Sequence, residues 1–257
     1  MKLDAAKLTD IGFTRDVNQD RCYADIGTHY GVTHGVFCVS DGMGGLSDGH
    51  IAATIAVDAA KHWQNEHLPA LLQANEGDIE YNVRDSLLVL FSRTNKEILE
   101  YGQKENIIIG TTCSMLVVLN NRYFIAHTGD SRIYLTYKQL LRREGVRLLT
   151  EDHTWLADQI KLGFLSQDEI NAHPSRNKLT GGLGIFECPR VMAQSGELTG
   201  TGAFILLSDG VYRVVSDSEI GHMSSKNKSS ANLTEALVNT ALDRGTRDNV
   251  TAVVVTF

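Results

Sequence analysis

The sequence has few of the features that mark linkers, repeats or membrane segments. It contains three prolines in 257 residues and no Pro/Gly/Ser-rich linker, internal repeat or low-complexity tract, so one domain spanning 1–257 is the simplest interpretation. No uninterrupted apolar stretch approaches the roughly 20 residues that cross a bilayer, and no basic cluster precedes an apolar run at the N-terminus. We therefore expect a soluble, unexported protein without a membrane partner.

The sequence also lacks long basic runs and closely spaced cysteine pairs. The formal net charge is −7 and no Lys/Arg-rich run extends beyond Arg142-Arg143, whereas nucleic-acid binding needs a basic face. The four cysteines form no C-x-x-C pair, and Cys38 and Cys113 lie in apolar runs where a thiol packs as a small hydrophobe. We expect no nucleic-acid partner, and reduced cysteines in a cytoplasmic protein.

Apolar periodicity predicts a layered α+β fold. Two long helices are expected at about 49–66 and 80–101, and shorter ones near 216–223 and 231–243. Short apolar or alternating runs predict strands at 36–39, 114–119, 122–128, 132–137, 203–207 and 250–257. Strands grouped in the centre with helices segregated around them favour α+β, whereas a parallel doubly wound sheet would need strict β–α alternation.

Aspartates recur beside the predicted strands. They are Asp41 after 36–39, Asp130 after 124–126, Asp209 after 203–207, Asp248 before 250–257, and Asp20 in a polar segment. Strand ends are rigid, and an adjoining glycine leaves a backbone carbonyl open to an ion. Converging carboxylates repel one another unless cations lie among them, and oxygen ligands suit Mg²⁺ or Mn²⁺ better than zinc. The alternative is ordinary turn chemistry, because Asp-Gly after a strand is commonly a turn.

The sequence lacks the residues that are typical of several known phosphate-binding and phosphate-transfer sites. No cysteine is followed six positions later by arginine, no Asp-x-Asp pair occurs, and Gly129–Arg132 lacks the histidine of calcineurin-like sites. The glycine-rich segment 41–45 fails the dinucleotide-binding pattern, because Ser47 stands where the third glycine would be. Arg15 could grip phosphate oxygens with its guanidinium fork, although a solvated surface arginine is the plainer interpretation.

Several short segments stand out in order along the chain: Gly12–Asp20, Val39–Gly45, Gly110–Thr112, His127–Arg132, Leu149–Thr154, Leu207–Gly210 and Arg247–Thr251. In this order they resemble the protein phosphatase 2C family in its compact bacterial form. Each block is weak alone, but the complete series in the family's order is specific and covers almost the whole chain. The resemblance implies a four-layer αββα sandwich, with two central antiparallel β-sheets flanked by helices and a metal site at one end.

The resemblance also implies roles for individual residues. Asp41, Asp209 and Asp248 would be direct ligands of two Mn²⁺ or Mg²⁺ ions, and Gly42 would contribute its carbonyl oxygen. Asp20 would coordinate directly or through water and take part in catalysis, and Arg15 would hold the substrate phosphate. A third ion, described in bacterial members, would be shared by Asp130 and Asp209. A flap at about 153–187 would influence substrate choice.

Two positions depart from the family's pattern. Gln19 stands where many members carry a metal-binding glutamate, so an amide or a water would replace one ligand. Met43 replaces the histidine of eukaryotic members, which removes that candidate general acid. The protonation of the leaving group must then come from another source.

The activity implied is hydrolysis of phosphoserine and phosphothreonine in proteins by metal-activated water. The partners would be phosphorylated proteins and a cognate bacterial Ser/Thr kinase, and a monomer is expected. Two alternatives remain open at the level of sequence: a non-catalytic phosphoprotein-binding module that keeps the fold, and a phosphatase for a small metabolite. The intact series of aspartates argues against the first.

Overall fold

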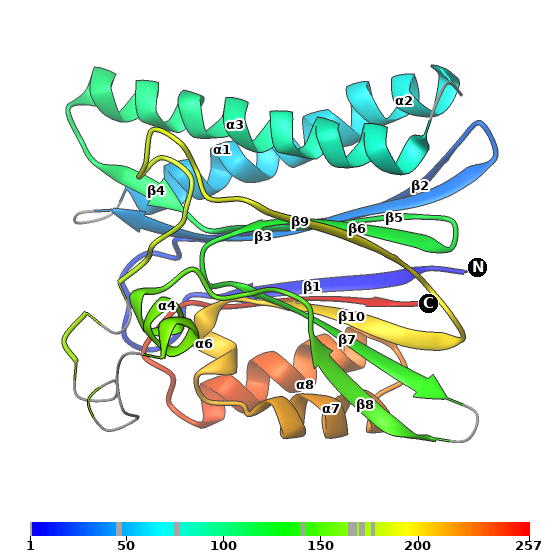
Figure 1. Ribbon diagram of the computed structural model, residues 1–257. Helices are drawn as coiled ribbons and strands as arrows, with labels where there is room; N and C mark the ends of the chain where they lie inside the picture. The colour runs from blue at the N-terminus through cyan, green and yellow to red at the C-terminus, as the bar shows by residue number, and fades with distance from the viewer. Residues whose placement is uncertain are drawn as a thin grey trace.

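Two antiparallel β-sheets lie face to face, and helices cover the outer face of each (Figure 1). The computed structural model describes residues 2–44, 48–74, 78–139, 142–163, 169, 173–175 and 178–257. Gly45 of the expected motif and residues 164–168, 170–172 and 176–177 of the expected flap lie outside the described residues. The predicted α+β class and four-layer αββα architecture are confirmed.

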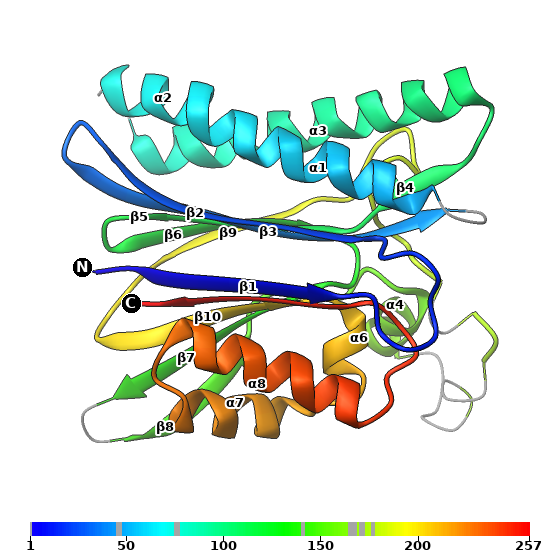
Figure 2. The same cartoon turned by 180° about the vertical axis from the view of Figure 1, so that it is seen from behind.

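Each sheet takes strands from distant parts of the chain. The five-stranded sheet has the order β1 (Asp4–Asp10), β11 (Val250–Thr256), β10 (Thr201–Leu207), β7 (Arg132–Gln139) and β8 (Arg142–Leu148). The other sheet has the order β2 (Asp20–His29), β3 (Val32–Gly44), β5 (Cys113–Leu119), β6 (Arg122–Thr128) and β9 (Met192–Glu197), and β4 (Ile109–Thr111) pairs with the end of β3. Both chain ends therefore enter the five-stranded sheet as neighbours, β1 beside β11 (Figure 2).

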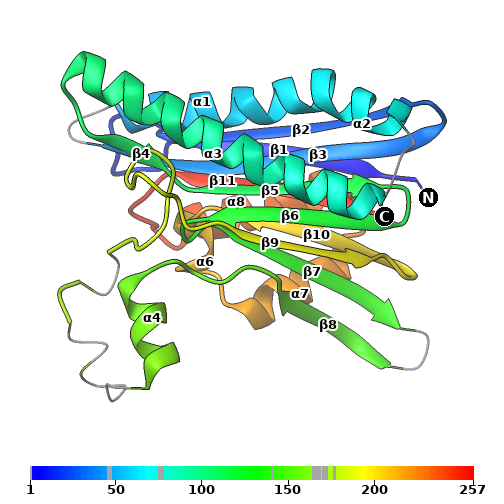
Figure 3. The ribbon, with the colours of Figure 1, turned by 45° about the horizontal axis from the view of Figure 1, so that its top comes forward.

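The helices are divided between the two outer faces. The β2–β3–β5–β6–β9 sheet is covered by α1 (Gly49–His62), the π-helical turn η1 (Trp63–His67), α2 (Leu68–Ala74) and α3 (Ile79–Glu105). The five-stranded sheet is covered by α6 (Asp209–Tyr212), α7 (Asp217–Lys226) and α8 (Ser230–Asp243). Helix α4 (Trp155–Leu162) extends from the sandwich at the end away from the chain termini (Figure 3). No helix in the described part of the chain is both long and apolar enough to cross a membrane.

The period of two along each strand explains why the sheets stack. Val36 and Cys38 of β3 point into the core beneath α1 and α3, whereas Phe37 and Val39 point into the core between the sheets. Strand β11 alternates in the same way, with Val253 toward the other sheet. Because side chains alternate across a pleated sheet, a strand buried on both faces must be apolar throughout. This explains the continuous apolar runs from which the strands were predicted.

One strand boundary differs from the prediction in a way that matters for the site. The apolar run ends at Val39, but β3 continues to Gly44, so Asp41 lies inside a strand and not at its end. The reason is a change of partner: β3 pairs with β5 up to Val39 and with β4 from Gly42 onward. Backbone pairing keeps this polar segment extended without any apolar pattern. Asp20 likewise opens β2, where only a polar segment was expected.

Candidate metal centre

Asp20 and Asp41 are opposed residues on neighbouring strands. The antiparallel register of β2 and β3 places them directly across from each other. Asp20 is 1% exposed, and neither of its carboxylate oxygens has a hydrogen-bond partner within the described residues. The hydroxyls of Thr251 and Ser208 lie close enough to lower its pKa, although neither forms a hydrogen bond with it. A buried carboxylate without partners is costly unless a cation compensates it.

Asp209 and Asp248 approach from the other sheet. Asp209 begins α6 directly after β10, and Asp248 lies just before β11, the strand that pairs with β10. The two segments touch closely: a Cβ on Gly210 would lie 2.0 Å from the carbonyl oxygen of Asn249, so only glycine fits there. Asp209 Oδ1 is buried and has no hydrogen-bond partner in the described part of the chain. The end of the sandwich thus gathers carboxylates from both sheets.

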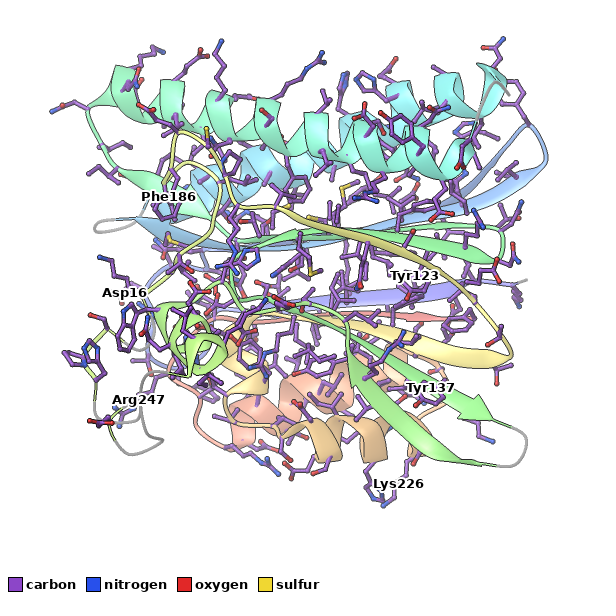
Figure 4. The ribbon with its side chains drawn as sticks, in the orientation of Figure 1. Asp16, Tyr123, Tyr137, Phe186, Lys226 and Arg247 are labelled. Atoms are coloured by element: carbon purple, nitrogen blue, oxygen red, sulfur yellow. The ribbon has the colours of Figure 1, made fainter. Side chains whose placement is uncertain are left out.

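Arg15 lies against Asp248. Its Nη2 is 2.8 Å from Asp248 Oδ2, and its side chain is 51% exposed. This hydrogen bond raises the pKa of Arg15, and the nearby charges of Asp41 and Asp209 act in the same direction. Figure 4 shows Asp16, which follows Arg15 in the chain, and Arg247, which precedes Asp248, at the same end of the molecule, opposite Tyr137. Arg15 is therefore a half-exposed cation at the edge of the carboxylate cluster.

Asn249 fixes the loop that carries Arg15. Its Nδ2 donates to the carbonyls of Ile11 and Val17 at 2.9 and 3.2 Å, and its Oδ1 accepts from Gln19 N at 2.8 Å. The β1–β2 loop is thereby tied to the segment that bears Asp248. Nothing in the sequence singled out Asn249 for this task. Its place in the block Arg247–Thr251, directly after a candidate ligand, is the signal that could have drawn attention to it.

Thr112 joins the backbone of Asp41 to the loop that carries Asp130. Its hydroxyl accepts from Asp41 N at 2.9 Å and bonds to Ser131 Oγ at 2.7 Å, while its backbone N–H donates to Asp41 O at 2.9 Å. Gly129 has φ +104°, and a Cβ there would lie 2.6 Å from Thr112. Asp130 is thus held at the same end of the sandwich, 6% exposed.

Arg213 contacts two of the expected ligands. Its Nη2 lies 2.7 Å from Asp209 Oδ2 and 3.6 Å from Asp130 Oδ2. No sequence pattern indicated Arg213. The signal that could have found it is its position four residues after Asp209, because Asp209 begins α6 and residues four apart on a helix face the same side.

The pKa values of the clustered aspartates are raised because the carboxyl groups are buried and lie close to one another. Burial and the neighbouring carboxylates raise the pKa of Asp20 to about 7. Burial and the charge of Asp209 raise the pKa of Asp130 to about 7, although Arg213 opposes the shift. Burial, Asp20 and Asp209 also raise the pKa of Asp41 well above its ordinary value. Close positive charge is what would return such groups to their ionised form.

The donor set fits hard divalent ions. All the side-chain groups are carboxylates, and the backbone at Gly42 is closely packed: a Cβ there would lie 2.1 Å from the carbonyl of Gly49 and 2.8 Å from that of Gln19. Taken as they stand, no three His, Cys, Asp or Glu side chains among the described residues surround one point closely enough to hold an ion. Arg15 and Arg213 engage Asp248 and Asp209, which draws those carboxylates toward guanidinium groups. Oxygen ligands of this kind suit Mn²⁺ or Mg²⁺.

Comparison with known proteins decides the family. The family model described as protein phosphatase 2C matches residues 14–252. The chain belongs to the protein phosphatase 2C family. It is 32% identical over 261 residues to the protein phosphatase PhpP of Streptococcus pneumoniae, covering 99% of this chain and 98% of that protein. It is accordingly an enzyme, a metal-dependent phosphoprotein phosphatase.

Solved structures of related phosphatases share its fold. The S. agalactiae serine/threonine phosphatase superposes with a TM-score of 0.82 at 28% identity, covering 99% of both chains. The catalytic domain of the serine/threonine protein phosphatase PstP, solved in complex with two manganese ions, gives a TM-score of 0.76 at 26% identity, with 98% of this chain and 97% of that chain covered. The resemblance stated from the sequence motifs is confirmed.

The phosphatase fold gathers every site residue that the sequence indicated. Arg15 and Asp130 lie in the β1–β2 and β6–β7 loops, and Asp20 and Gly42 lie in β2 and β3. Asp248 lies two residues before β11, and all of them join Asp41 and Asp209. Thr112 and Asn249 lie in the motif blocks but were given no role from the sequence, and Arg213 was not indicated at all. Two of these orient loops through hydrogen bonds, and the third supplies charge.

Proposed function

We propose that this phosphatase dephosphorylates phosphoserine and phosphothreonine in proteins, using two Mn²⁺ or Mg²⁺ ions as cofactors. Asp41, Asp209 and Asp248 would hold the ions, with the Gly42 carbonyl, and Asp20 would bind directly or through water. When bound, such ions lower the pKa of a water molecule and neutralise charge on the phosphate. The observation that carries the proposal is the buried, partnerless carboxylate of Asp20 opposite Asp41. In the same cluster Asp209 Oδ1 lacks a partner too, among the residues described.

Arg15 would orient the substrate phosphate. Its guanidinium offers parallel N–H donors that match phosphate oxygens, and half of its side chain is open to solvent. Among the described residues, Asp248 orients it through a single 2.8 Å contact, which leaves further N–H groups for a ligand. The Asn249 tie to the β1–β2 loop keeps this side chain at the edge of the carboxylates.

Substitution of Arg15 should chiefly weaken substrate binding. We expect Arg15→Ala to raise KM for a phosphopeptide by about tenfold or more, because a charge-assisted bidentate contact contributes roughly 1.5–3 kcal/mol. Arg15→Lys keeps the charge but loses the planar guanidinium fork, so its KM should lie between those of the wild type and Arg15→Ala. Steady-state kinetics with Mn²⁺ held constant measures this. An unchanged KM in Arg15→Ala would remove the residue from the phosphate site.

A direct assay tests the function as a whole. Phosphoserine, phosphothreonine and phosphotyrosine peptides would be incubated with the protein in Mn²⁺, Mg²⁺ or chelator. We expect release of phosphate from the first two peptides with either ion, little from the third, and none in chelator. Binding of phosphopeptides without turnover would favour a non-catalytic module, and turnover of small phosphate esters alone would favour a metabolite phosphatase.

The proposed function also includes a domain extent, partners and a cellular environment. We place the whole catalytic function in one domain, 1–257, with the flap at about 153–187 influencing substrate choice. The partners would be phosphorylated proteins and a Ser/Thr kinase whose action this enzyme reverses, and the enzyme would act as a monomer in the cytoplasm. The lack of a C-x-x-C pair and the place of Cys38 and Cys113 in apolar runs suit a reducing environment.

A further inference from the structure

Asp130 and Asp209 share a positively charged neighbour, Arg213. One nitrogen of Arg213, Nη2, reaches both carboxylates, at 2.7 Å from Asp209 Oδ2 and 3.6 Å from Asp130 Oδ2. These two aspartates are the residues expected to share a third divalent ion. The guanidinium therefore lies beside the oxygens that such an ion would need.

The fold holds Arg213 in this place. Helix α6 is one turn long, and Arg213 follows it, donating its backbone N–H to Asp209 O at 3.1 Å. The helix is anchored in turn, because Thr246 Oγ1 donates to Gly210 O at 2.8 Å. The two carboxylates are 8% and 10% exposed, whereas the arginine side chain is 42% exposed. Buried acids thus meet a cation that enters from the solvent side.

Nearby arginines are engaged elsewhere. Arg132 donates to both oxygens of Asp152, at 3.0 and 2.8 Å, and its guanidinium lies 4.0 Å from the ring centroid of Tyr212. Arg15 is bound to Asp248. Among the ion pairs of the described residues, Asp130 pairs with Arg213 alone.

We infer that Arg213 replaces the third divalent ion, so that this phosphatase binds two ions and neutralises the Asp130–Asp209 pair with its own side chain. The inference rests on the proposed two-ion centre. A guanidinium stays protonated at any working pH, so its charge opposes a further cation at this position permanently. Like charges a few ångströms apart repel strongly where solvent is largely excluded. Asp130 then acts as a positioning residue for Arg213, and Asp209 serves the core ions with its other oxygen.

The number of bound ions tests this directly. Equilibrium dialysis against Mn²⁺, followed by metal analysis, should give two ions per chain for the wild type and three for Arg213→Ala. Arg213→Lys keeps the positive charge and should stay at two. The double variant Arg213→Ala/Asp130→Asn should return to two, because the extra ion loses a carboxylate. Thermal unfolding of each variant confirms that it is folded.

Each outcome is decisive. Three ions on the wild type, or two ions on both the wild type and Arg213→Ala, would overturn the inference while leaving the core centre intact. A count of zero throughout would overturn the proposed two-ion centre and this inference together. A third ion in Arg213→Ala that survives Asp130→Asn would place the new ion elsewhere and also overturn the assignment.

Discussion

Asp209→Asn should abolish Mn²⁺-dependent phosphatase activity while the chain stays folded. Asparagine has the same shape and keeps one oxygen, but it removes the negative charge from a side chain whose Oδ1 is buried and partnerless among the described residues. Removing one preorganised electrostatic group typically lowers kcat by about 10²–10³-fold, and loss of a ligand should cost at least that. The packing of α6 depends on Gly210 and Thr246 and should not change.

The measurement is the initial rate on a phosphothreonine peptide at saturating Mn²⁺, with circular dichroism as the check on folding. Asp243→Asn is the matched control, because Asp243 also lies in a helix beneath the five-stranded sheet but is exposed to solvent. The control should retain wild-type activity. Near-normal turnover by a well-folded Asp209→Asn protein would refute the role given to Asp209.

Mn²⁺ should stabilise the protein much more at pH 8 than at pH 5. At a free concentration of 100 times Kd, one ion contributes about 2.7 kcal/mol. For a chain of this size that corresponds to a rise in Tm of about 5–10 °C. At pH 5 the shift should fall below half of that value. The reason is that burial raises the pKa of Asp20 to about 7 and that of Asp41 well above its ordinary value, so an ion binding between these proposed ligands at pH 5 must displace protons.

The folded, metal-free chain retains protons on the buried carboxyls of Asp20 and Asp130 up to about pH 7, whereas the unfolded chain releases them near pH 4. Their contribution to stability is therefore fully present below about pH 4, declines as the pH rises to about 7, and is absent above it. Bound cations remove this penalty, and their benefit is greatest at high pH.

Thermal unfolding with Mn²⁺ and with chelator, compared at each pH, isolates the effect. The comparison cancels groups that titrate with or without the ion, such as His127, whose pKa burial lowers to about 4. Asp20→Asn removes one titrating group and should flatten the pH dependence of the metal-free protein. Equal Tm shifts at pH 5 and pH 8 would contradict the placement of the ions among buried carboxyls.

Local pattern carried much of the fold because the strands are buried on both faces. The run 203–207 is apolar throughout and the terminal run from Val250 is mostly apolar, and both form strands at or near those bounds. By contrast β1 and β2, which carry mixed polar residues, were not predicted. Their pairing partners, β11 and β3, keep them extended. A strand whose own pattern is weak is specified by its neighbours.

The sequence alone determined which atoms are available for chemistry and which family the chain resembles. Aspartates beside apolar runs predicted an oxygen donor set, and the family resemblance carried by the motif blocks implied Asp41, Asp209 and Asp248 as ligands. Tertiary structure alone decided how these groups meet. Asp20 faces Asp41 only through strand register, and Arg15 reaches Asp248 across 233 positions of the chain. Arg213 lies beside Asp130 only because β6, β7, β10 and α6 meet at one end of the sandwich. Contacts between residues far apart in the chain depend on how sheets pair and pack, and no local pattern encodes that distance.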